Sequence, residues 1–127
     1  MDFASLKRGA EWRAGMDGIF FSDESRKLDI IEPGLVSRKV KAYGEKSMVV
    51  EVYFETGAEG AAHSHPHEQI SYCLDGSFDY YVGETHYVLK SGDSILVEGG
   101  ARHGTKCLDS GRLLDVFSPP REDFLAR

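Results

Sequence analysis

The sequence is 127 residues long, with 41% hydrophobic and 28% charged residues, so its length and composition fit one folded domain and exclude a disordered chain. No apolar run approaches the roughly 20 residues that a membrane helix needs. The formal net charge is −6, and the acidic excess lies in residues 48–127, which argues against nucleic acid or an anionic membrane as a partner. An anionic ligand would have to be held by a metal ion or by individual arginines.

Residues 1–34 show weak patterning, and we expect an N-terminal arm or edge strands there, with residues 19–21 and 28–31 as the candidate strand segments. The first residues lack the apolar core of a signal peptide, so we expect a cytoplasmic protein. Cys73 and Cys107 are too few for a disulfide framework and are expected to be buried, reduced thiols.

From residue 35 onward the hydrophobic pattern is that of short strands separated by turn sequences rich in glycine and aspartate. The expected strands are LVSRKVKAY, SMVVEVYFE, QISYCL, SFDYYVG, THYVLKS, SILVEG, TKCL and RLLDVFS. Eight such strands indicate an all-β antiparallel sandwich or barrel with little room for helix. We expect a single domain over residues 1–127, with the barrel at 35–120.

The segment HSHPHEQ, residues 63–69, is a candidate metal site. His63 and His65 are two residues apart, so on a strand they project from the same face, roughly 6.6 Å apart along the chain. Gln69 has the same parity, a turn at Pro66 would bring it to the same ion, and His103 is a candidate fourth ligand. A surface loop with three histidines is the alternative interpretation. His67 is expected either to lie behind the metal ligands without binding the ion or to be exposed. His86 is expected to be an ordinary strand residue.

Two spaced motifs resemble the signatures of the cupin superfamily. The first is Gly57, five residues, His63-x-His65, three residues, Gln69, six residues, Gly76; the second is Gly92, five residues, Glu98-x-Gly100, two residues, His103. The chain departs from the usual pattern where Gln69 replaces glutamate, Glu98 replaces proline and Cys107 replaces asparagine. The resemblance implies a double-stranded β-helix, or jelly roll, with a divalent metal (Ni, Zn, Fe, Mn or Co) held by His63, His65, Gln69 and His103.

The amide of Gln69 has a consequence for the charge of such a site. Three neutral imidazoles and a neutral amide leave the full +2 on the ion, where a carboxylate would reduce it to +1. The set therefore favours Lewis-acid chemistry on an anionic or oxygen-rich ligand over the oxygen activation typical of two histidines and a carboxylate.

The stretch RLLDVFSPPREDFL, residues 112–125, is the second candidate site. On an extended chain Leu113, Asp115 and Phe117 share a face. If that face points inward, desolvation raises the pKa of Asp115 into the range of a general acid or base; if it points outward, the other face makes the core. Both alternatives stay open on the pattern alone. The SPPREDFLAR segment predicts a short C-terminal helix with Ser118 as its cap.

Together, HSHPHEQ and DVFSPPREDFL resemble the KdgF-type cupins of pectin and alginate breakdown, over about residues 35–125. The resemblance implies an enzyme that opens the ring of 4,5-unsaturated uronate monomers to the linear 4-deoxy-5-keto uronate. It places Asp115, Phe117 and Arg121 in the active site. Residues 1–34 have no counterpart in the resemblance.

Each of these residues also has a structural alternative. Arg121 either binds a substrate carboxylate or caps the last helix at the surface, Phe117 is either a wall for the sugar or core, and Arg38 is a weaker candidate for a second carboxylate ligand. The alternative functions are another metal-dependent cupin enzyme, a dioxygenase or sugar isomerase, and a non-catalytic sugar-acid binder. We expect a small anionic sugar acid as ligand and a homodimer.

Overall fold

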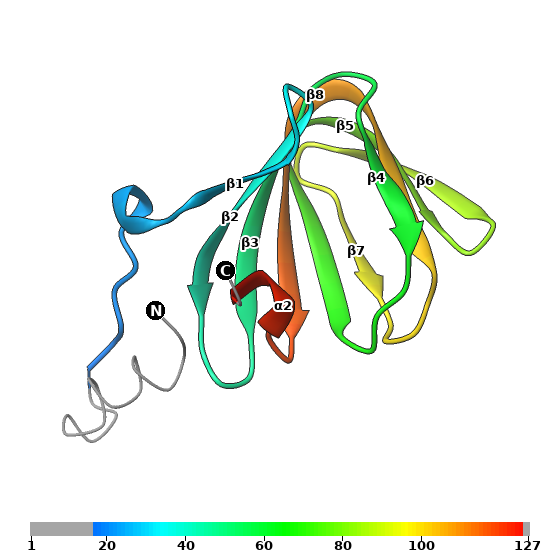
Figure 1. Cartoon of the computed structure of the whole chain (residues 1–127). Coiled ribbons are helices and arrows are strands. Elements are labelled where there is room, and N and C mark those ends of the chain that lie inside the picture. The colour runs from blue at the N-terminus through cyan, green and yellow to red at the C-terminus, as the bar shows by residue number, and fades with distance from the viewer. Residues whose placement is uncertain (1–16, 126–127) are drawn as a thin grey trace.

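Eight strands and one short α-helix form the part of the chain, residues 17–125, that the computed structural model describes (Figure 1). The elements in chain order are the 3₁₀ turn η2 (Asp23–Ser25), β1 (Leu28–Glu32), β2 (Val36–Tyr43), β3 (Met48–Phe54), β4 (Glu59–His63), β5 (Glu68–Val82), β6 (Thr85–Lys90), β7 (Ser94–Val97), β8 (His103–Ser118) and α2 (Glu122–Leu125). The prediction of an all-β fold with a short helix near the C-terminus is confirmed. No helix in residues 17–125 is long and apolar enough to cross a membrane.

The two long strands, β5 and β8, belong to both layers of the structure. Their first and last halves, Glu68–Cys73 and Leu113–Ser118, pair with each other between β3 and β7. Beyond a bend, Phe78–Val82 pairs with His103–Cys107, and this pair lies between β4 and β6. The two ends of each long strand therefore belong to different layers (Figure 1).

The bend lies where the two long strands approach each other at glycines. Gly76 has a φ of 77°, and a Cβ there would overlap the backbone of Asp109 and Ser110. A Cβ on Gly111 would overlap the backbone of Asp75 in the same way. Only residues without a side chain permit this contact, which turns both strands from one layer into the other.

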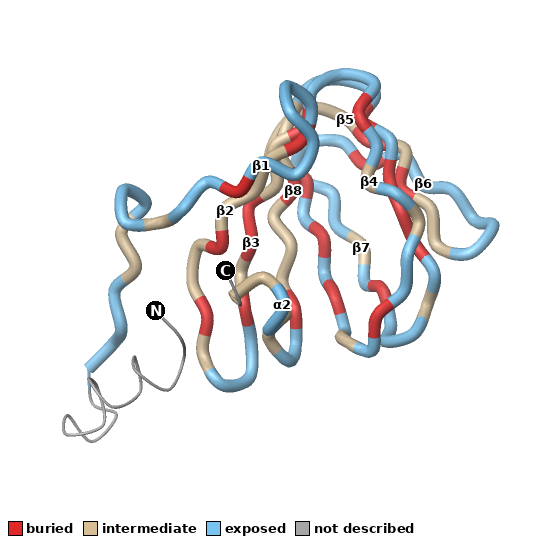
Figure 2. The backbone as a smooth tube through the Cα atoms, in the orientation of Figure 1, coloured by how far each residue is buried: buried red, intermediate tan, exposed pale blue. Residues whose placement is uncertain are grey.

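The core consists of two clusters of buried hydrophobic residues. Burial alternates along the strands; in β5, for example, Gln69, Ser71 and Cys73 are buried while their neighbours are exposed (Figure 2). Ten residues of the larger cluster pack together: Val36, Phe54, Ala58, Cys73, Phe78, Tyr80, Leu89, Val97, Cys107 and Leu113. Both cysteines are free and buried, as expected.

Three local predictions differ from the structure. The stretches QISYCL and SFDYYVG form one continuous strand, as do TKCL and RLLDVFS, because the glycine pair bends each strand without ending it. Residues 59–63, which are not among the eight expected strands, form β4 because they pair with β8. Ser118 does not cap the helix: its hydroxyl donates to the Lys46 carbonyl, and α2 begins at Glu122.

The N-terminal segment is described in part. Its predicted edge strand at residues 28–31 is confirmed as β1, which pairs with β2, whereas residues 19–21 form no strand. The expected arm also includes residues 1–16, which lie outside the described residues.

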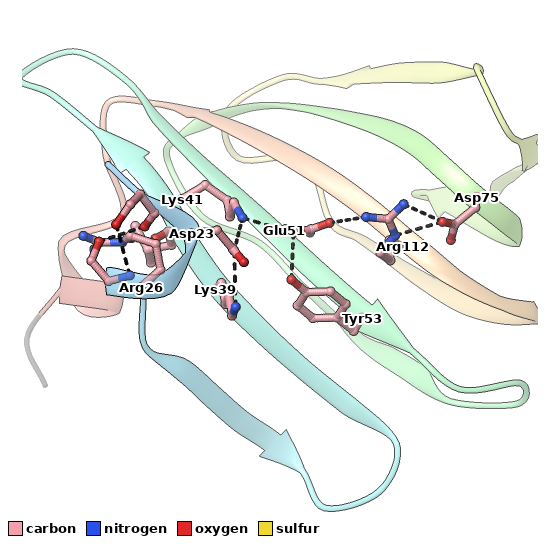
Figure 3. A network of polar contacts seen from close by, with 11 residues as sticks. Asp23, Arg26, Lys39, Lys41, Glu51, Tyr53, Asp75 and Arg112 are labelled. Atoms are coloured by element: carbon pink, nitrogen blue, oxygen red, sulfur yellow. Dashed lines mark hydrogen bonds and ion pairs between the residues drawn. The ribbon is translucent and has the colours of Figure 1, made fainter. Parts of the chain in front are cut away.

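A polar network crosses the outer face of β2, β3 and β8 (Figure 3). Glu51, 7% exposed, accepts hydrogen bonds from Tyr53 (2.7 Å) and Arg112 (2.6 Å), and Lys41 lies 3.5 Å away. Arg112 donates onward to Asp75 at 2.8 Å. Burial raises the pKa of Glu51, but the hydrogen bonds from Tyr53 and Arg112, together with the charges of Lys41 and Arg112, lower the pKa overall. This network stabilises the face opposite to the cavity.

Candidate metal centre and its cavity

The three predicted metal-binding histidines lie together. His63 ends β4 and His103 begins β8, where the two are cross-strand partners, and His65 lies in the turn before β5. Ligand atoms of His63, His65 and His103 lie within 4.8 Å of one another. The strand pairing of β4 with β8 thus brings the two histidine segments together.

The backbone fixes the tautomer of each imidazole. The Nδ1 atoms of His63, His65 and His103 lie 2.8, 3.1 and 2.9 Å from the carbonyl oxygens of residues 61, 67 and 101. Because a carbonyl only accepts, each Nδ1 carries the proton and each neutral ring keeps its lone pair on Nε2. Burial lowers the pKa of His65 and of His103, which favours this neutral form.

Gln69 directs its amide oxygen, the fourth candidate ligand atom, toward the three histidines. Its Oε1 lies 2.9 Å from Nε2 of His65 and 3.2 Å from Nε2 of His103. Its Nε2 donates to Ser71 Oγ (3.0 Å) and Tyr80 Oη (3.3 Å), which orients the amide with its oxygen toward the imidazoles. Lone pairs of two nitrogens and one oxygen therefore converge with no hydrogen between them, as a shared cation requires.

These residues fit a divalent metal. His63, His65, Gln69 and His103 would hold it, and the backbone carbonyls that accept from each Nδ1 orient the imidazole ligands. The +2 charge of the ion would be undiminished by this neutral set.

Asp115 points into the cavity beside these residues, which settles the alternative left open by the sequence. Its Oδ1 accepts a hydrogen bond of 2.6 Å from Ser71 Oγ. Burial raises the pKa of Asp115 to about 6, against smaller lowering effects of Ser71, Gln69 and Arg121. Its neighbours on the same face, Leu113 and Phe117, are 2% and 3% exposed.

Arg121 lies over the cavity and is not a surface arginine. Its side chain is 14% exposed, and Nε and Nη2 donate to Asp123 at 3.0 and 2.9 Å. The guanidinium carbon lies 5.3 Å from the ring centre of Phe117 and 4.3 Å from that of Phe124. The ion pair and the rings hold the guanidinium in place at the start of α2.

Phe117 and Arg38 complete this side of the site. The ring of Phe117 packs edge-on against His65, with centroids 5.7 Å apart, so it is both core and cavity wall. Arg38 points inward from β2, with its guanidinium carbon 3.7 Å from the centre of the Phe124 ring and its Nε 3.9 Å from Asp29.

The remaining two histidines are not members of the three-histidine cluster. His67 packs against the rings of His65 and Phe117 and contributes no atom to the three-histidine cluster. His86 is exposed on β6 and its Nδ1 lies 2.9 Å from Asp79 Oδ1. His86 therefore belongs to the hairpin of β5 and β6, outside the metal centre.

A cavity of about 230 Å³ is lined by all of the predicted site residues except His65. Its wall includes His63, Gln69, His103, Asp115, Phe117 and Arg121. A larger hollow, about 500 Å³, opens beside Tyr53 and Arg112, but no histidine lines it. The candidate metal ligands His63, Gln69 and His103, with Asp115 and Arg121, thus face the smaller cavity.

Comparison with known proteins agrees with this arrangement. A family model described as a cupin domain matches residues 50–117. The pectin degradation protein KdgF of Dickeya dadantii (strain 3937) is 35% identical over 108 residues, which cover 84% of this chain and 97% of that protein. The chain is a KdgF-type cupin.

Solved structures show the same likeness for this cupin. An RmlC-like cupin from Shewanella frigidimarina NCIMB 400 is 37% identical, with a TM-score of 0.78 over 85% of this chain and 96% of that one. KdgF from Halomonas sp. is 32% identical, also with a TM-score of 0.78, over 84% of this cupin and 99% of that chain.

Sequence reasoning missed two polar residues of the site, Ser71 and Tyr80. Both are buried, 0% and 2% exposed, and both contact Gln69. The signal for Ser71 was present, because it shares strand parity with Gln69 and Cys73. Tyr80 lies beyond the bend of β5, so no local spacing relates it to Gln69.

Proposed function

We propose that this cupin opens the ring of 4,5-unsaturated uronate monomers from pectin or alginate breakdown and releases the linear 4-deoxy-5-keto uronate. The observation that carries the proposal is the shared cavity, which is lined by His63 and His103 of the three-histidine cluster and by Gln69, Asp115 and Arg121. The likeness to the pectin degradation protein KdgF supports it.

The size and charge of the cavity suit such a substrate. Its volume of about 230 Å³ is below the roughly 300–1,000 Å³ of sites for drug-sized ligands, which favours a single sugar. In this proposal Arg121 binds the substrate carboxylate through its Nη1 and Nη2 hydrogens, since Nε and Nη2 already donate to Asp123. Phe117 lies along the ring face.

The proposed reaction is an isomerisation and needs no co-reactant. The C1 hydroxyl loses its proton, the bond from C1 to the ring oxygen breaks, and C1 becomes an aldehyde. The electron pair moves to the ring oxygen, the resulting enolate takes a proton at C4, and C5 becomes a ketone. We assign the proton transfers to the carboxyl group of Asp115, whose Oδ1 is fixed by Ser71. A bound divalent metal would supply Lewis-acid polarisation of substrate oxygens.

The test follows the ultraviolet absorbance of the conjugated double bond of 4,5-unsaturated galacturonate. Protein loaded in turn with Ni, Zn, Fe, Mn and Co should accelerate its loss over an enzyme-free blank. Asp115→Asn should lower kcat by about 10²- to 10⁴-fold, as expected for loss of a general acid or base. Asp109→Asn is the matched control, since Asp109 also accepts from a serine across β5 and β8 but lies on the exposed side.

Two results would overturn the proposal. No acceleration with any of the five metals would exclude ring opening. Binding of the uronate without turnover would then favour a sugar-acid binder. Oxygen uptake by the iron-loaded protein would instead favour a dioxygenase. Normal turnover by Asp115→Asn would exclude the assigned proton transfer.

We also propose that the cupin is a homodimer, as the resemblance implies. Sedimentation equilibrium of the full chain tests this, and a mass equal to the 14.1 kDa monomer at all concentrations would contradict it.

A further inference from the structure

A buried set of hydrogen bonds connects the metal-facing amide of Gln69 with Asp115. Gln69 Nε2 donates to Ser71 Oγ and to Tyr80 Oη, the two hydroxyls lie 3.0 Å apart, and Ser71 donates to Asp115 Oδ1 at 2.6 Å. Gln69, Ser71 and Tyr80 are all at most 5% exposed. Water is thus largely kept from the bonds among these three side chains.

The number of hydrogens fixes the direction of these bonds. The single hydrogen of Ser71 goes to Asp115, so Ser71 Oγ can only accept from its two other neighbours. The hydrogen of Tyr80 therefore goes to Ser71, and the two amide hydrogens of Gln69 go to Ser71 and Tyr80. Every hydrogen points away from the histidine cluster and toward Asp115.

We propose that Ser71 and Tyr80 are positioning residues that connect Gln69 to Asp115. We call the hydrogen bonds from Gln69 through Tyr80 and Ser71 to Asp115 the relay. Position 69 must be an amide because the relay begins with its two N–H groups. The relay sets two things at once: the amide oxygen of Gln69 faces the imidazoles, and Asp115 keeps one oxygen occupied by Ser71.

A carboxylate at position 69 would break the relay at its first step. A glutamate has no hydrogen to donate, so Ser71 and Tyr80 would turn their own hydrogens toward it. Asp115 would then compete with a second carboxylate for the single hydrogen of Ser71. Gln69→Glu should retain metal binding, because a carboxylate is a good ligand, and should still disturb Asp115.

The first test compares two serines in equivalent positions. Ser71 and Asp115 are cross-strand partners of β5 and β8, and so are Ser77 and Asp109, which form an exposed hydrogen bond of 2.7 Å. Ser71→Ala should lower kcat by about 10- to 100-fold, the range for loss of an outer hydrogen-bond partner, while the affinity for Zn²⁺ measured by calorimetry changes less than about twofold. Ser77→Ala should change neither.

The second test separates the relay from the charge of the metal site. Gln69→Glu should bind Zn²⁺ at least as tightly as the native chain and lose kcat about 10- to 100-fold. If both single variants act on Asp115 through the same bonds, Gln69→Glu with Ser71→Ala should be little worse than either alone. Multiplying losses would show that the two residues act independently and would overturn the relay.

A third readout does not use the substrate, which matters because the expected loss of kcat rests on the proposed ring opening. In ¹⁵N-labelled, Zn²⁺-loaded protein, both side-chain amide hydrogens of Gln69 should exchange slowly with solvent. Ser71→Ala and Tyr80→Phe should shift or accelerate them, whereas Ser77→Ala and Tyr53→Phe should not; Tyr53 is a matched control because its hydroxyl donates to Glu51 outside the cavity.

The outcomes distinguish the two proposals. Amide signals that respond as stated, in a protein without activity on the uronate, would retain the relay and overturn the proposed function. Rapid exchange of the native Gln69 amide, or native kcat in Gln69→Glu, would overturn the relay.

Discussion

Arg121 offers the sharpest test of how this cupin would hold an acidic sugar. The guanidinium is 14% exposed and is fixed by Asp123 and by the ring of Phe124, so it meets a ligand in one orientation. A hydrogen bond to a charged group contributes about 1.5–3 kcal/mol. At 1.4 kcal/mol per factor of ten, Arg121→Gln should raise KM for the unsaturated uronate by about 10- to 150-fold.

The assay is steady-state loss of the ultraviolet absorbance, with kcat and KM determined separately. KM should carry most of the change, because the arginine binds substrate and transition state alike. Asp123→Asn is the control: it removes the ion pair with Arg121 but leaves the guanidinium. If Asp123→Asn raises KM as much as Arg121→Gln does, the effect comes from displacement of α2. An unchanged KM in Arg121→Gln would refute carboxylate binding by this arginine.

Three further predictions concern stability. Zn²⁺ at 100 times its Kd should stabilise the native protein by about 2.7 kcal/mol and a chelator should reverse this; a melting temperature indifferent to Zn²⁺ would argue against the site. Arg112→Met should cost about 1–2 kcal/mol in urea unfolding at pH 7, a modest value because the arginine is 42% exposed. Because the pKa of Glu51 is lowered in the folded protein, its stabilisation is fully present above the ordinary glutamate pKa and is lost as the pH falls through the lowered value. The cost of Arg112→Met should therefore shrink as the pH falls below about 4, and a cost that stays the same between pH 7 and pH 2 would contradict the assignment. Gly111→Ala should cost about 3 kcal/mol, because its Cβ would overlap the Asp75 backbone, whereas Gly44→Ala, with open space around it, should be nearly neutral.

Most of the fold could be predicted because strand alternation is a local signal. Gln69, Ser71 and Cys73 alternate with exposed residues over a few positions, and this period is visible without any partner strand. The bends were not predictable in the same way. The sequences LDGS and LDSG have the composition of reverse turns, and only the contact between Gly76 and Gly111 makes them bends within continuous strands.

The residues of the candidate site also differ in whether a local sequence signal predicts them. Spacing within HSHPHEQ and within RLLDVFS was enough to nominate His63, His65 and Asp115. The relay through Tyr80 was out of reach, because residue 80 meets Gln69 only after the bend in β5. The ion pair of Arg121 with Asp123 was equally hidden, since it depends on where α2 begins.

The long pairing of β5 with β8 also sets the order in which the site can assemble. His103 meets Gln69 across 34 residues of chain, and Asp115 meets Ser71 across 44. Contacts so distant in sequence form late, because the loop between them must close first. A growing chain therefore carries His63 and His65 for some time as a loose pair, and it brings His103 and Asp115 to Gln69 and Ser71 only when β8 has docked.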